Sequence, residues 1–209
     1  MVRHLIFDMG GVVFDLGYEQ AVRRFEEIGV SDARIQLDPC IQSGIFGDLE
    51  GGRISCEEFR QGLSARIGRD LTAEQCAYAW KGYILDLPQR NLNKLLDLRS
   101  RGYRLFLLSN TNPFITQWAH SPQFSPAGRP MDDYFDRLYF SCDLKMMKPD
   151  PAIFQYVLDA EGLDPAETLF IDDSPRNTEA AARLGIRTMC PRNNADWTAD
   201  IENYLCPKP

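Results

Sequence analysis

The stretch HLIFDMGGVVF, residues 4–14, decides the fold of this 209-residue chain. Its first four residues form a short apolar run that predicts a buried strand, and Asp8 ends that strand. Gly10 and Gly11 follow, and glycine allows the backbone to turn sharply there. We therefore expect Asp8 at the carboxyl end of a buried strand, beside a tight turn.

Four more apolar runs are short and continuous rather than alternating. They cover residues 103–108, 137–140, 168–171 and 186–189. Continuous runs of this length are typical of parallel strands that are buried on both faces. Helical patterns lie between them, at residues 90–101, 151–161 and 176–184. This alternation of strands and helices predicts an α/β fold built on a parallel sheet.

Residues 16–88 interrupt the alternation. Their apolar residues recur at helical spacing, as Tyr18 and Phe25 do, and no run in the segment predicts a strand. We interpret this segment as a helical cap that is inserted directly after the first strand. The core then consists of residues 1–15 and 89–209.

Charge and composition exclude several classes of protein. Lys and Arg total 23 against 30 Asp and Glu, and the resulting net charge of −7 argues against a nucleic-acid binder. No apolar run approaches the roughly 18 residues of a membrane span, and the first residues lack the apolar centre of a signal peptide. The six cysteines show no CxxC spacing, so we expect free thiols and a cytoplasmic protein.

Polar side chains stand just beyond four of the predicted strands. Asp8 ends the first strand, Ser109 the second, and Asp172 and Asp173 the strand at 168–171, while Lys148 follows the strand at 137–140. Taken singly, each has an ordinary interpretation as a helix cap, a turn residue or a solvated charge. Because ligands bind at the carboxyl ends of parallel strands, we expect these side chains to form one site. Adjacent carboxylates at a strand end are costly unless a cation or hydrogen bonds compensate their charge, and carboxylate oxygens suit Mg²⁺.

The motifs FDMGGVV, LLSNT, KMMKPDP and FIDDSPRN together resemble those of the haloacid dehalogenase (HAD) superfamily of hydrolases, and they span almost the whole chain. The resemblance implies a Rossmann-like core with a helical cap between the first two motifs. It also implies that Asp8 attacks phosphorus to form an aspartyl-phosphate, which water then cleaves. In this scheme Ser109 and Lys148 bind the phosphoryl group.

The same resemblance implies a Mg²⁺ cofactor. The expected ligands are Asp8, the backbone carbonyl of Gly10, and the pair Asp172 and Asp173.

Three residues are further candidates for substrate or phosphate binding. Asn110 follows Ser109 and offers amide groups, and Gly11 lies in the turn after Asp8. Glu50 lies in the cap loop DLEGGR, where two glycines supply the mobility that a closing loop needs. Weaker candidates are side chains that would face the substrate or support a loop, namely Asp15, Trp80, Tyr83 and Asn177. His120 is a candidate for a stand-in proton donor.

One position departs from the family pattern. Phosphatases of this superfamily usually carry a second Asp two residues after the nucleophile as general acid and base, and Gly10 stands there in this chain. Such a group contributes about 10²–10⁴-fold in rate. A phosphatase whose substrate has a good leaving group, such as a sugar 1-phosphate, tolerates the loss of this acid. The chain also resembles a subgroup of glucose 1-phosphate phosphatases that lacks the second Asp, so we expect a Mg²⁺-dependent sugar-phosphate phosphatase.

Two alternatives stay open. A 2-haloacid dehalogenase also uses an Asp nucleophile without the second Asp, but it needs no metal and typically lacks the pair Asp172 and Asp173. A catalytically degenerate member would bind a phosphorylated metabolite without turnover, a role that does not require the nucleophile or Lys148. We expect a small phosphorylated metabolite as partner, no nucleic acid and no membrane, and a monomer or weak homo-oligomer.

Overall fold

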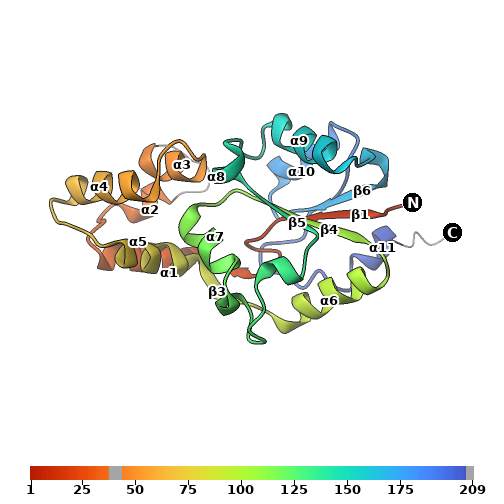
Figure 1. The fold of residues 1–209 in the computed structure, drawn as a ribbon, viewed down its shortest axis with the longest axis horizontal. Helices are drawn as coiled ribbons and strands as arrows, with labels where there is room; N and C mark the ends of the chain where they lie inside the picture. Colours follow the sequence, from red (N-terminus) through yellow and green to blue (C-terminus); the bar gives the residue numbers. More distant parts are fainter. Residues whose placement is uncertain (38–43, 206–209) are drawn as a thin grey trace.

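The computed structural model describes residues 1–37 and 44–205. Its centre is a five-stranded parallel sheet in the order β5-β4-β1-β6-β7 (Figure 1). The chain leaves the central strand first toward one edge of the sheet and later toward the other, and ligands bind above the carboxyl ends of strands at such a reversal. The predicted α/β fold on a parallel sheet is confirmed. The strands are β1 (His4–Phe7), β4 (Arg104–Ser109), β5 (Arg137–Phe140), β6 (Thr168–Ile171) and β7 (Arg187–Met189).

Helices cover both faces of this sheet (Figure 1). Leu5 and Phe7 of β1 belong to the apolar core on one face and Ile6 to the core on the other, and all three are fully buried. This explains why the strands appear in the sequence as continuous apolar runs. The core helices are α6 (Gln89–Ser100), α7 (Pro113–Ala119), α8 (Ser141–Leu144), α9 (Pro151–Glu161), α10 (Pro175–Ala182) and α11 (Glu202–Leu205). Helices α9 and α10 pack on the face of Ile6, and α6 and α11 pack on the opposite face.

Local sequence sets the ends of helix α9. Asp150 Oδ1 accepts a hydrogen bond from the Ala152 N–H at 2.9 Å, and Pro151 occupies the first turn. Gly162 ends the helix with a φ of 63°. These are an N-cap, a first-turn proline and a left-handed C-terminal glycine, and the sequence predicts the same limits from them.

The helical cap lies at one end of the molecule, on the left of Figure 1. Aromatic rings hold its helices together: Phe25 contacts Phe46 and Trp80, and Phe59 contacts the same two rings, with centroids 5.2–5.8 Å apart. Such tilted and edge-on pairs add to the burial of apolar area. The cap helices are α1 (Tyr18–Glu27), α2 (Ala33–Gln36), α3 (Gly44–Glu50), α4 (Cys56–Ile67) and α5 (Ala73–Trp80). The boundaries at residues 16 and 88 stay a prediction.

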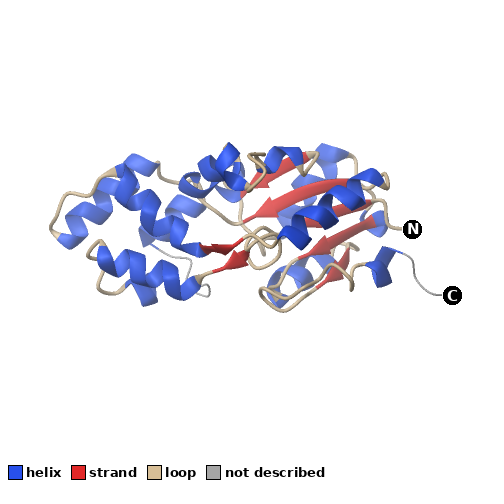
Figure 2. Ribbon diagram, turned by 90° about the horizontal axis from the view of Figure 1, so that it is seen from below, coloured by secondary structure: helices blue, strands red, loops and turns tan. Residues whose placement is uncertain are grey.

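A two-stranded antiparallel ribbon joins the cap to the core, although no strand was expected in this part of the chain. It pairs β2 (Asp15–Leu16) with β3 (Ile84–Asp86), and Figure 2 shows it between the cap helices and the parallel sheet. Strands of two and three residues are too short to show periodicity in the sequence. Gln20 Nε2 supports the ribbon by donating to the carbonyls of Gly82 and Ile84, at 3.0 and 3.2 Å.

The remaining elements are short 3₁₀ turns. They are η1 (Lys81–Tyr83), η2 (Pro122–Phe124), η3 (Met131–Asp133) and η4 (Pro165–Glu167). Within the described residues, no helix is long and apolar enough to cross a membrane. Cys56, Cys76, Cys142 and Cys190 are free thiols, as expected, and Cys40 and Cys206 lie outside the described residues.

Candidate active site

A buried lysine lies between carboxylates from two neighbouring strands. Lys148 Nζ is 2.9 Å from Asp8 Oδ1 and 2.6 Å from Asp172 Oδ2. Asp8 follows β1 and Asp172 follows β6, and the Asp8 N–H donates to the carbonyl of Ile171 at 2.8 Å, which keeps the two strand ends in register. Lys148 is 2% exposed and Asp172 is fully buried. The structure therefore brings together three of the charged residues that the sequence singled out.

The electrostatics of this cluster show a shortage of positive charge. Burial raises the pKa of Asp8 to about 7; Lys148 opposes that rise, while Asp172 and Asp173 add to it. Burial and the neighbouring Asp172 likewise raise the pKa of Asp173. Burial disfavours the charge of Lys148, but attraction to Asp172 and Asp8 raises its pKa above the ordinary value. Three carboxylates thus surround one ammonium group, and a further cation would relieve their repulsion.

The residues present fit a Mg²⁺ ion. Oxygens of Asp8, Asp172 and Asp173 lie within 4.8 Å of one another. Among the described residues, none donates a hydrogen bond to the carbonyl of Gly10, which lines the same cavity. Hard oxygen ligands of this kind are those that Mg²⁺ prefers.

Asp172 and Asp173 differ in how their oxygens are used. Asp172 accepts hydrogen bonds from Lys148 Nζ, from the Ser174 N–H at 2.8 Å and from Asn177 Nδ2 at 3.0 and 3.1 Å. Asp173 accepts one side-chain bond, from Asn193 Nδ2 at 2.6 Å. Asp172 is therefore placed to orient Lys148, and Asp173 has more oxygen capacity left for a metal. Asn177 supports the acidic pair rather than the loop after Asp8.

Gly11 is needed because of its closeness to Asp173. Its φ is 79°, and a Cβ atom there would stand 2.7 Å from Asp173 Oδ2 and 2.9 Å from Asn193 Nδ2. Its N–H donates to the carbonyl of Phe14 at 2.8 Å, so that group is not free for the expected contact with phosphate. Gly11 instead lets the loop after Asp8 approach the acidic pair.

Asn110 and Ser109, at the end of β4, have different roles. Asn110 Nδ2 donates to the carbonyl of Lys148, and the Lys148 N–H donates to Asn110 Oδ1, both at 2.8 Å. The Asn110 side chain therefore holds the lysine backbone, which leaves its backbone N–H for the expected phosphate contact. Ser109 is 2% exposed, and its hydroxyl makes one long bond of 3.4 Å to the next carbonyl, so it is available to a ligand at the cavity wall.

The structure adds residues that the sequence did not single out. The loop after β7 supports the loop after β1: Asn193 binds Asp173, and the Asn194 N–H donates to the Gly11 carbonyl at 3.0 Å. Asn194 also exchanges side-chain hydrogen bonds with the backbone of Leu16, at 2.6 and 3.1 Å. The signal that could have found them is their position, because they too follow a strand of the sheet.

The cluster opens into a cavity of about 950 Å³ between core and cap. The cap contributes Glu50 with the aromatic side chains of Phe46, Trp80 and Tyr83. Trp80 and Tyr83 stack with centroids 6.0 Å apart. Their edge of the cavity is therefore largely apolar.

Two of the weaker candidates do not reach the cavity. Asp15 lies in the ribbon, opposite Asp86. His120 pairs with Asp132 at 2.9 Å on the surface, so it does not replace the missing acid at position 10.

Fold and site define a hydrolase of the haloacid dehalogenase type, and residues 2–185 match the family model described as haloacid dehalogenase-like hydrolase. The chain belongs to this family, as its motifs predict. It is similar to a D-ribitol-5-phosphate phosphatase of Bacteroides thetaiotaomicron, with 42% identity over 98% of this chain and 99% of that one.

Solved structures agree with this assignment. A predicted HAD-like family hydrolase from Porphyromonas gingivalis has 44% identity and a TM-score of 0.95 over the full length of both chains. A HAD family enzyme from Bacteroides thetaiotaomicron, in complex with magnesium and inorganic phosphate, has 36% identity and a TM-score of 0.86, covering 95% of this chain and 98% of that one. Mg²⁺ as the cofactor is thus supported by the acidic cluster and by a solved relative.

Proposed function

We propose that this chain is a Mg²⁺-dependent phosphatase that hydrolyses a small phosphorylated sugar or sugar alcohol through an aspartyl-phosphate on Asp8. The observation that carries the proposal is the cluster of Asp8, Asp172 and Asp173 oxygens within 4.8 Å, with Lys148 buried among them. The similarity to a D-ribitol-5-phosphate phosphatase over nearly the whole of both chains supports it.

In the proposed reaction, a carboxylate oxygen of Asp8 attacks phosphorus and the bond to the substrate oxygen breaks. Water then attacks the phosphorus of the aspartyl-phosphate, the bond to the Asp8 oxygen breaks, and inorganic phosphate and Asp8 are released. Lys148 and the Ser109 hydroxyl hold the phosphoryl oxygens, and Asp172 keeps the lysine oriented. When bound by Asp8, Asp173 and the Gly10 carbonyl, Mg²⁺ supplies charge neutralisation for the phosphoryl group. Catalysis of this kind works by positioning and charge rather than by further covalent chemistry.

Position 10 limits how the leaving oxygen receives its proton. A Cβ atom on Gly10 would lie 2.7 Å from Leu16 Cδ1, so an apolar side chain occupies the space beside the place of the usual acid. The proton must come from water or from another group in the cavity. A sugar 1-phosphate, whose leaving hydroxyl is comparatively acidic, therefore belongs among the test substrates beside D-ribitol 5-phosphate.

The test is phosphate release by the purified protein from D-ribitol 5-phosphate, sugar 1-phosphates and sugar 6-phosphates. We expect turnover with Mg²⁺, none with EDTA, and none from the Asp8→Asn variant. Tight binding of a substrate without turnover would instead favour a degenerate member. Chloride release from 2-chloropropionate in the presence of EDTA would favour the dehalogenase, against which the pair Asp172 and Asp173 argues.

A further inference from the structure

Glu50 reaches the cavity from the cap and is fixed there by the core. It is the last residue of α3, and its backbone carbonyl accepts a hydrogen bond from Ser141 Oγ at 2.6 Å. Ser141 is fully buried and also accepts a bond from the Thr111 N–H at 2.9 Å, beside Ser109 and Asn110. The position of Glu50 is therefore tied to the phosphate-binding end of β4.

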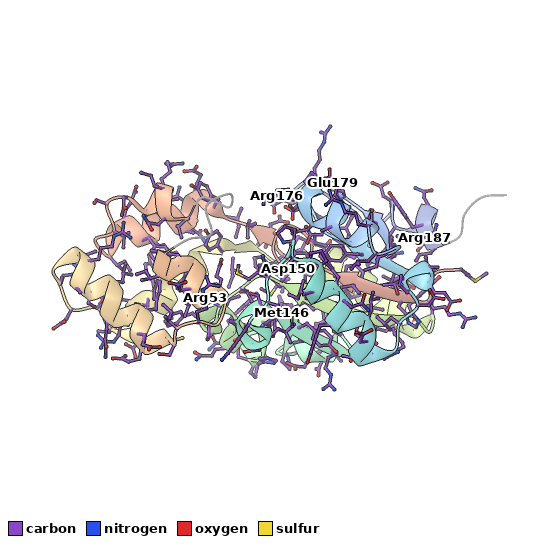
Figure 3. The ribbon with its side chains drawn as sticks, turned by 90° about the horizontal axis from the view of Figure 1, so that it is seen from above. Arg53, Met146, Asp150, Arg176, Glu179 and Arg187 are labelled. Carbon is purple, nitrogen blue, oxygen red and sulfur yellow. The ribbon has the colours of Figure 1, made fainter. Side chains whose placement is uncertain are left out.

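The turn that follows Glu50 is internally braced. Arg53 Nε donates to Asp48 Oδ1 at 2.7 Å, and Arg53 Nη2 donates to the carbonyl of Gly47 at 3.0 Å. Figure 3 shows Arg53 where the cap meets the core. Gly52 packs directly on α8, because a Cβ atom there would stand 2.0 Å from the carbonyl oxygen of Cys142. The segment that carries Glu50 is thus a docked turn rather than a free loop.

Glu50 shares the cap side of the cavity wall with Phe46, Trp80 and Tyr83. Burial alone raises the pKa of Glu50 to about 7, and the Glu50 charge contributes to a rise in the pKa of Tyr83. Glu50 belongs to cap helix α3, whereas Asp8 and Lys148 of the charged cluster belong to the core. Among the described residues, no side chain donates a hydrogen bond to this carboxyl group.

Glu50 is half-buried and lines the cavity, so a hydroxyl of a bound ligand can hydrogen-bond to its carboxyl group. A carboxyl group that is protonated near neutral pH both donates and accepts hydrogen bonds, as an alcohol does. An alcohol hydroxyl therefore satisfies it, an apolar tail leaves it unpaired, and a second anion is repelled once it ionises. Sites built to bind a hydroxyl discriminate strongly against analogues that lack it.

We propose that the carboxyl group of Glu50 binds a hydroxyl of the substrate tail, away from the phosphoryl group. The cavity then selects monophosphates whose tail is uncharged and carries several hydroxyl groups. This inference rests on the proposed phosphatase function and names the residue that reads the rest of the substrate. It assigns Glu50 to substrate selection and not to proton transfer at the leaving oxygen, which requires a place next to Asp8.

The test compares D-ribitol 5-phosphate with phenyl phosphate, which has no alcohol hydroxyl, in the wild type and in the Glu50→Leu and Glu50→Gln variants. Losing a hydrogen bond to a partly buried group corresponds to about 5- to 150-fold in kcat/KM. We expect Glu50→Leu to lose that much on D-ribitol 5-phosphate, mainly through KM, and to keep its activity on phenyl phosphate within about threefold, which also shows that it folds. Glu50→Gln, whose amide donates and accepts, should retain most of the preference.

The control is Glu26→Leu, the same change at an exposed glutamate of α1, which should leave both substrates unaffected. An unchanged substrate preference in Glu50→Leu overturns this inference while the proposed function stands. If Glu50→Gln loses kcat on D-ribitol 5-phosphate but not on phenyl phosphate, Glu50 is an acid catalyst and this inference is overturned. A wild type that hydrolyses neither substrate with Mg²⁺ overturns the proposed function and this inference with it.

Discussion

Replacing Lys148 by methionine tests the electrostatic account of the site. The Lys148 side chain is 1% exposed, and its Nζ contacts both Asp8 and Asp172. Methionine fills a similar volume but leaves two buried carboxylates without their cation. Removing one partner of a buried ion pair costs about 3–5 kcal/mol. Protonation of Asp8, whose pKa is already raised to about 7, offsets part of that loss. We expect the free energy of unfolding to fall by about 3 kcal/mol, or roughly a hundredfold in the unfolding equilibrium.

The assay is urea unfolding at neutral pH, followed by the fluorescence of the three tryptophans. Lys145→Met is the matched control, because Lys145 is exposed in the same segment and makes no ion pair among the described residues. Its free energy of unfolding should stay within about 0.5 kcal/mol of the wild type. Lys148→Met should also lose phosphatase turnover, because an Asp8 held protonated is no nucleophile. If Lys148→Met unfolds at the same urea concentration as Lys145→Met, the cluster does not depend on the lysine charge and the reasoning fails.

Three further changes test other parts of the structure. Gly11→Ala forces a Cβ atom to within 2.7 Å of Asp173 Oδ2, so we expect Mg²⁺ binding to weaken by about tenfold or more. The measurement is the Mg²⁺ concentration that gives half-maximal activity. An unchanged concentration would contradict the crowding. Gly10→Asp should lower the free energy of unfolding by about 1–3 kcal/mol, because the new side chain crowds Leu16. In a double-mutant cycle, Leu16→Ala should recover part of that loss. If the effects of the two substitutions simply add, the side chains at positions 10 and 16 do not meet. Glu202 has a pKa lowered to about 2 from 4.5 by hydrogen bonds from cationic side chains, so its stabilisation is complete above the unfolded value and is lost as the pH falls through the folded one. Because Glu202 is 39% exposed, Glu202→Gln should lower the free energy of unfolding by less than about 1 kcal/mol near neutral pH and by nothing near pH 2. If wild type and variant differ in stability by the same amount at every pH during acid denaturation, this assignment is refuted.

The sequence predicts the centre of the sheet well because β1, β4 and β6 are buried along nearly their whole length. Asp8 and Asp172 stand where continuous apolar runs end, so their position at the carboxyl edge follows from the pattern alone. The cap appears as a break in that pattern. The ribbon does not appear, because Asp15 and Asp86 belong to strands too short to have a period.

The hydrogen bonds within the site are harder to foresee. Asn110 binds the backbone of Lys148, a partner 38 residues away in sequence, and no local pattern encodes that pairing. Gly11 was expected to contact phosphate, yet its N–H is used inside the loop. Glu50 was found from its glycine-flanked loop, but its attachment to Ser141 depends on how the cap docks.

The short ribbon between cap and core has a wider consequence. Because Asp15 and Asp86 are paired, the two ends of the insertion leave the sheet side by side. The chain therefore enters and leaves the cap at neighbouring points, and the turn after Glu50 gives the cap a second contact with the core at α8. The cluster of Asp8, Lys148 and Asp172 is built from the core alone, so a change of side chain in the cap alters the cap side of the cavity without removing any member of that cluster.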